Sequence, residues 1–165
     1  MIYDRFTQGI NTLPLLSPVD TAAAAVATPF LKLGGAHGGT LFVHFGTITA
    51  ASADQSVTVT LEAATTSASG SEAAVAFNYR LSGAVGANTW GSITTAATTG
   101  ASIATTDDGK MLAIDIDPAK FLAAKADCTH VRAVITPDAG GTVTMVSSFA
   151  QLEPRVSQAA MVSAT

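Results

Sequence analysis

The chain has 165 residues, of which 48% are apolar and only 12% are charged, and its formal net charge is -4. This composition excludes a disordered acidic chain, because disorder goes with low hydrophobicity and high charge. It also argues against a nucleic-acid binder, which needs a basic surface to displace counterions from phosphates. The length predicts one domain, with or without tails.

The sequence shows neither a membrane-spanning segment nor a secretory signal. The sequence has no run of about 18 consecutive apolar residues, so it predicts no membrane-spanning helix. Residues 1–5 lack the basic region and apolar run of a secretory signal, so we expect synthesis in the cytoplasm without Sec export. Cys128 is the single cysteine and precedes a strand-like run, which favours a buried, unreactive thiol.

Residues 1–20 predict an extended N-terminal arm. Gly9, Pro14 and Pro18 interrupt its apolar residues, and proline biases the preceding residue toward extended geometry. These apolar side chains need cover, either as an edge strand of their own domain or on a neighbouring subunit. Our hypothesis is the second, that residues 2–20 are ordered by a neighbouring subunit or shell. The interface residues expected in this arm are Ile2, Tyr3, Phe6, Ile10, Leu13, Leu15 and Leu16.

After the arm, apolar residues alternate with polar ones at period two, which is typical of half-buried strands. The expected strands cover residues 28–33, 41–45, 57–63, 75–81, 112–116, 131–135 and 143–149. Turn-forming residues at 67–71, 107–109 and 137–141 separate them. The glycine-rich residues 34–39 predict a mobile, hairpin-type loop, and residues 90–106 a weak strand pair or a long loop.

One short helix is expected after residue 117. Asp117 is its predicted N-cap, Pro118 its first residue, and Phe121 and Leu122 its buried side. Strands with one buried face each close as two packed sheets, and long connections favour crossing topologies over a meander. The sequence therefore predicts an all-β, jelly-roll-like or Greek-key β-sandwich over residues 21–153, with a C-terminal tail at 154–165.

The chemistry-bearing residues predict neither an enzyme nor a metal or cofactor site. His37 lies among glycines, but the Gly-Lys-Ser/Thr ending of a phosphate-binding loop is missing. His44 and His130 lack the paired spacing of a zinc motif. Asp115 and Asp117, with the acidic turn before them, raise calcium binding or glycoside hydrolysis as weaker alternatives, but the loop of an EF-hand is absent. No Gly-x-Ser-x-Gly nucleophile motif occurs.

Trp90 is a candidate for a binding or interface residue. It lies in a glycine-containing stretch outside the expected core strands. A tryptophan in such a place is typical of two uses, a stacking platform for sugars or an anchor of a protein interface. We keep Trp90 as an interface residue and leave the sugar-binding alternative open.

Several stretches together resemble small tailed-bacteriophage virion proteins of the capsid decoration, or cement, type. They are Leu-Pro-Leu-Leu at 13–16, Val-Thr-Val-Thr-Leu-Glu-Ala-Ala-Thr at 57–65, Met-Leu-Ala-Ile-Asp-Ile-Asp at 111–117, His-Val-Arg-Ala at 130–133 and Leu-Glu-Pro-Arg at 152–155. The resemblance implies a β-sandwich or jelly roll, commonly trimeric, on the outer capsid surface of a virion. It implies the major capsid protein and further copies of this chain as partners, with neither nucleic acid nor membrane, and no active site.

The expected role is mechanical, since a bridge between major capsid protein subunits helps the expanded shell resist the pressure of the genome. Low charge and many small residues suit broad contact, because few long side chains must be ordered on binding. Two alternatives stay open. One is a head-to-tail connector, tail-tube or tail-terminator protein, and the other is a carbohydrate-binding module on a virion surface.

Overall fold

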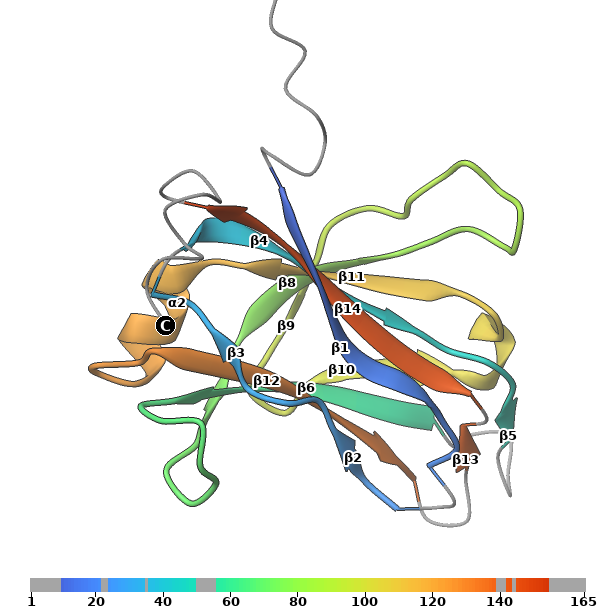
Figure 1. The fold of residues 1–165 in the computed structure, drawn as a ribbon. Helices are drawn as coiled ribbons and strands as arrows, with labels where there is room; N and C mark the ends of the chain where they lie inside the picture. Colours follow the sequence, from blue (N-terminus) through green and yellow to red (C-terminus); the bar gives the residue numbers. More distant parts are fainter. Residues whose placement is uncertain are drawn as a thin grey trace, which may run out of the picture.

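The computed structural model describes residues 10–21, 24–34, 36–49, 56–138, 142–143 and 145–154. Within them, two antiparallel β-sheets form a sandwich (Figure 1). The all-β sandwich predicted from the alternation is therefore confirmed. No described helix has the length and hydropathy needed to cross a bilayer.

The first sheet, sheet A, has six strands, all paired antiparallel. Their order is β1 (Asn11–Val19), β14 (Val146–Pro154), β4 (Ala36–His44), β11 (Met111–Ile116), β8 (Phe77–Leu81) and β9 (Thr94–Ala96). Neighbours in this sheet come from distant parts of the sequence, as β1 and β14 do. That connectivity is the one expected of a Greek-key or jelly-roll-like sandwich rather than a meander.

The second sheet, sheet B, is built around two long strands. Its order is β10 (Ala101–Ala104), β6 (Ser56–Ala64), β12 (His130–Pro137) and β2 (Val26–Ala27), with β3 (Leu31–Lys32) also on β12 and β7 (Ala73–Val75) also on β6. A two-residue pair joins β13 (Thr142–Val143) to β5 (Ile48–Thr49). The remaining elements are the 3-10 turn η1 (Thr105–Asp107) and the helix α2 (Pro118–Ala124).

The core lies between the sheets and consists of the inward side of each alternating strand. In β4, Leu41 and Val43 are fully buried, and Phe45 directly after the strand is buried with them. Other large, fully buried side chains include Val57, Val59, Leu61, Phe77, Ile103, Leu112, Ile114, Phe121 and Ile135. Branched residues dominate because they suit a pleated, half-buried surface.

The expected strand 75–81 is two strands in different sheets. β7 pairs with β6 in sheet B, whereas β8 pairs with β11 in sheet A, and Ala76 lies between them. Val75 and Phe77 are both buried, so the side-chain alternation continues across the change of sheet and hides it from the sequence. Residues 90–106 also supply strands to both sheets, since β9 pairs with β8 and β10 with β6.

The predicted helix start is confirmed. The carboxylate of Asp117 accepts a hydrogen bond from the N–H of Ala119 at 3.0 Å, and Pro118 is the first helical residue. Phe121 is buried in the core, but the expectation for Leu122 is wrong, because its side chain is 51% exposed. Adjacent residues of a helix point about 100° apart, so a helix that meets the core along one side buries Phe121 and leaves Leu122 outside.

The prediction of a loop over residues 34–39 is wrong from Ala36 onward. β4 begins there, so His37, Gly38 and Gly39 belong to a strand that pairs with β14 on one side. At Gly39 a Cβ would overlap the carbonyl oxygen of Gln151 and lie 3.0 Å from Cα of Leu152. Glycine is required here because the backbone of β14 passes too close for any side chain.

The hypothesis that a neighbouring subunit orders the N-terminal arm is wrong for residues 11–19. These form β1, an edge strand that pairs with β14 of the same chain. Leu13, Leu15 and Leu16 are partly buried against the chain's own core, and Ile10 just before the strand is half-buried. The folded domain therefore includes residues that we assigned to the arm, and an edge position tolerates the prolines of β1.

Other parts of the predicted termini fall outside the described residues. Ile2, Tyr3 and Phe6 are among them, as are residues 155–165 of the predicted tail, whereas Pro154 ends β14.

We expect Gly39→Ala to destabilise the fold by about 1–3 kcal/mol, because the new methyl group meets backbone that cannot move without breaking the β4–β14 pairing. Urea unfolding measures the loss. Gly34→Ala is the matched control, since the nearest atom to a Cβ there is Cε of Lys32 at 4.0 Å. Equal stability of the two variants would contradict this account of β4.

Candidate functional site

The outer face of sheet A carries a row of side chains that crosses five strands. Direct cross-strand partners share one face of a sheet. The pairing joins Pro14 of β1 to Phe149 of β14, Phe149 to Phe42 of β4, Phe42 to Ala113 of β11, and Ala113 to Arg80 of β8. Since Leu41 and Val43 point into the core, Phe42 between them points outward with the whole row.

Three aromatic side chains meet at the middle of this row, and we call them the aromatic cluster: Phe42, Phe149 and Trp90. The rings of Phe42 and Phe149 are stacked, with centroids 4.7 Å apart and an interplanar angle of 16°. Trp90 tilts against Phe42 at a centroid distance of 6.3 Å. The side chain of Trp90 is still 45% exposed, so the cluster presents an apolar surface to solvent.

Trp90 reaches the sheet from the connection between β8 and β9, which projects beyond the sheets in Figure 1. Backbone hydrogen bonds close the neck of this connection: the N–H of Gly83 donates to the carbonyl of Thr89 at 2.9 Å and that of Gly91 to the carbonyl of Leu81 at 2.8 Å. At its start, the hydroxyl oxygen of Ser82 accepts from the N–H of Met111 at 2.9 Å. The connection is therefore tied both to itself and to β11.

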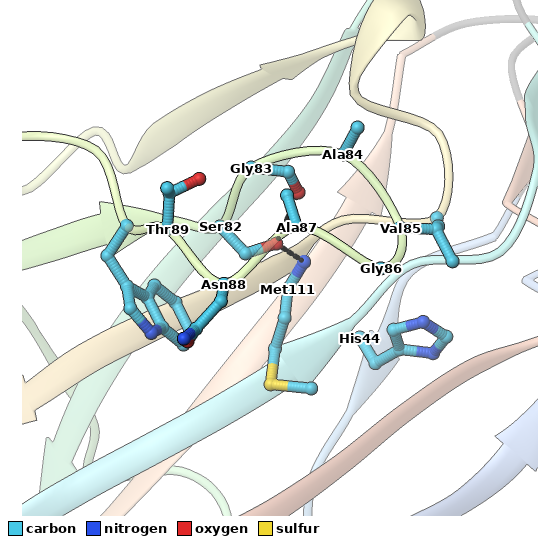
Figure 2. Close-up of a pocket in the computed structure, with 12 residues that line it drawn as sticks. His44, Ser82, Gly83, Ala84, Val85, Gly86, Ala87, Asn88, Thr89 and Met111 are labelled. Carbon is cyan, nitrogen blue, oxygen red and sulfur yellow. Dashed lines mark hydrogen bonds between the residues drawn. The ribbon is translucent and has the colours of Figure 1, made fainter.

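The same connection forms one wall of an open pocket of about 280 Å³. His44 of β4 and Met111 of β11 line this pocket from the sheet, and Figure 2 shows the connection curving past both of them. The lining residues are His44, Ser82, Gly83, Ala84, Val85, Gly86, Ala87, Asn88, Thr89, Trp90, Gly109 and Met111. None of them is Asp, Glu, Lys or Arg, so the pocket carries no permanently charged side chain.

The outer face of sheet B differs, because its central charged groups are paired. Arg132 donates from Nε to Glu62 and from a terminal guanidinium nitrogen to Glu72, each at 2.7 Å. The guanidinium carbon also lies 4.6 Å from the centre of the Phe30 ring. This arrangement ties β12 to β6 and to the segment before β7, and it leaves Arg132 satisfied without a ligand.

The pKa of Glu72 is lowered from its ordinary value of 4.5. The main cause is the hydrogen bond that the carboxylate accepts from the N–H of Gly70 at 2.8 Å, followed by its own N–H, and the charge of Arg132 acts in the same direction. Folding therefore favours the ionised form of Glu72.

The structure does not bring the three histidines together. His37 and His44 lie in β4 and His130 in β12, where its Nδ1 is 2.7 Å from the Thr129 hydroxyl. Across the described ranges, no group of three or more His, Cys, Asp or Glu is close enough to hold a metal ion. The thiol of Cys128 is only half-buried, which differs from the expected buried position, and it donates to the carbonyl of His130 at 3.2 Å.

The carboxylates considered for calcium take part in local structure. Asp107 pairs with Lys110 at 2.7 Å, and Asp108 accepts from the N–H of Ile48 at 2.7 Å. Asp117 caps α2, and Asp115 is exposed on β11. Hydrogen bonds of the fold thus explain three of the four acidic residues.

No protein-family model, no curated protein and no solved structure matches this chain. Of the sequence-predicted interface residues, only Trp90 lies on an open apolar surface in the described part of the chain. Its partners Phe42 and Phe149 were not among the predicted interface residues. The sequence did indicate an exposed position for Phe42, since it is a large apolar residue on the outward side of an alternating strand.

We expect Glu72→Gln to lower the free energy of unfolding near neutral pH but not in acid. Because the folded-state pKa is depressed, the carboxylate contributes stability above its ordinary pKa, and this contribution is lost as pH falls through the folded pKa. Urea unfolding of both proteins from neutral to acidic pH measures this. Glu153→Gln, at an exposed end of β14, controls for the change in net charge. A difference that persists unchanged into acid would contradict the role of Glu72.

Proposed function

We propose that this chain is a structural protein of a tailed-bacteriophage virion. It binds the outside of the capsid, after synthesis in the host cytoplasm, and stabilises the shell by bridging major capsid protein subunits. The observation that carries this proposal is the aromatic cluster on the outer face of sheet A. The resemblance in sequence supplies the partner, and the cluster supplies a surface for contact.

The aromatic cluster has the composition of an interface hot spot. Trp and other aromatic residues dominate the binding energy of protein interfaces, above all where a ring of other contacts excludes water. Covering a large apolar side chain is worth about 1.5–3 kcal/mol. The stacked pair of Phe42 and Phe149 also orients the rings before binding, so little side-chain entropy remains to be lost.

Bridging needs at least two contacts, and the proposed homotrimer would provide three copies of the cluster at one position on the shell. Ile2, Tyr3 and Phe6 remain proposed interface residues. Leu13, Leu15 and Leu16 support an interface less than the sequence indicated, because they are packed on the chain's own core. We therefore propose the outer face of sheet A, and not residues 11–19, as the main surface that contacts the shell.

Stabilisation of the shell follows from linkage. A protein that binds the expanded shell and not the dissociated subunits stabilises the shell by RT ln(1 + [L]/Kd), which reaches about 2.7 kcal/mol at a hundredfold excess over Kd. Such a role needs no reacting group and no cofactor. It needs affinity, more than one contact point and a rigid domain between them.

The test is binding to expanded capsids of the encoding bacteriophage assembled without this chain. Wild-type protein is expected to sediment with the capsids, and Phe149→Ala and Trp90→Ala to bind at least tenfold more weakly, which corresponds to about 1.4 kcal/mol. Leu122→Ala is the matched control, because it also truncates a half-exposed apolar side chain but on α2. Thermal unfolding of each variant establishes that it is folded.

Two results would overturn the proposal. One is that the wild-type chain does not bind capsids, or forms a ring that binds only necks or tails. The other is that Phe149→Ala and Trp90→Ala bind as tightly as Leu122→Ala.

A further inference from the structure

We propose that the pocket between the 82–90 connection and the strands β4 and β11 binds a neutral saccharide of one or two rings, stacked on Trp90. This inference goes beyond shell binding and concerns the chain free of the shell, because shell binding would cover Trp90. The pocket lies beside the aromatic cluster, and Trp90 belongs to both.

The lining selects an uncharged ligand. Neither acidic nor basic side chains face the pocket, apart from the imidazole of His44. A charged group would lose part of its hydration there without gaining a counter-charge. Ala84, Val85 and Met111 make part of the wall apolar, while the rest is polar side chain and backbone. A ligand with both C–H and hydroxyl surfaces suits this mixture.

Trp90 supplies the stacking surface. It lines the pocket, its side chain is 45% exposed, and Phe42 contacts its ring in a tilted arrangement. The axial C–H groups of a pyranose ring carry partial positive charge, and the face of an indole ring is negative, so the two attract when stacked. Because Phe42 is itself held by Phe149, the indole is positioned before a ligand arrives.

Polar groups flank the stacking surface. Asn88 and Thr89 directly precede Trp90, and His44 faces the pocket from β4. These three side chains make no hydrogen bond to any residue that the structure describes, so they are available to a ligand. An Asn side chain offers two donors and an acceptor, which matches the paired hydroxyl groups of a sugar. By contrast, the hydroxyl of Ser82 is engaged with Gly83 and Met111.

The pocket is shaped without a ligand. A Cβ at Gly83 would overlap the hydroxyl of Thr89, and one at Gly109 would lie 2.7 Å from a methyl group of Val85, so both glycines permit close packing of the wall. With the neck hydrogen bonds, this packing fixes the connection, and binding pays little for ordering it. The volume of about 280 Å³ is at the lower limit of ligand pockets, which fits one or two sugar rings.

Trp90 is the single tryptophan of the chain, so intrinsic fluorescence reports on this pocket directly. The probes are maltose, lactose, mannobiose and chitobiose, each titrated to about 50 mM, a range that saturates a site with a Kd of about 1 mM. At least one disaccharide is expected to give a saturable change in emission. Asn88→Ala should weaken that binding about fivefold, as expected for one lost hydrogen bond.

Ile93→Ala is the matched control, since Ile93 is 54% exposed on the same connection but does not line the pocket. It should bind like the wild type. Trp90→Ala, followed by calorimetry, should not bind. The proposal is overturned if no disaccharide of the four gives saturation, if Asn88→Ala and Ile93→Ala bind equally well, or if sialyllactose binds better than lactose.

Discussion

The double pairing of β4 is the constraint on which the rest of the structure depends. β14 is hydrogen-bonded along one side of this strand and β11 along the other, so β4 cannot rotate or slip without breaking both ladders. A shift by one residue would turn Leu41 and Val43 outward and Phe42 into the core. Gly39 permits this pairing, because β14 passes where a side chain would otherwise stand. The register of β4 therefore determines both which side chains enter the core and which form the aromatic cluster on the outer face.

The two faces of the sandwich have different chemistry as a consequence. On sheet B, Arg132 forms ion pairs with Glu62 and Glu72, so the central positive charge of this face is already paired within the chain. On sheet A, the outward row is apolar at its centre, and the β8–β9 connection adds Trp90 to it. The buried side of each strand stabilises the fold, whereas the surface that we propose for recognition is the outward face of sheet A.

The sequence predicted what local rules determine and missed what distant contacts determine. The alternation of apolar and polar residues predicted the strands around residues 57–63 and 112–116. The sequence Asp117-Pro118 predicted the start of α2. Glycines at 38 and 39 looked like a loop, because composition does not reveal that β14 lies against them. The docking of β1 and the meeting of Trp90 with Phe42 depend on residues far apart in the chain, so no local pattern predicts them.

The most direct test of the central claim, that the aromatic face of sheet A is where this chain binds its partner, is a reconstruction of the virion at side-chain resolution. The account predicts this chain on the outer shell, with Phe42, Phe149 and Trp90 covered by another protein chain. It would be contradicted by a particle in which those three rings face solvent in every copy, or in which the chain lies only in the neck or tail.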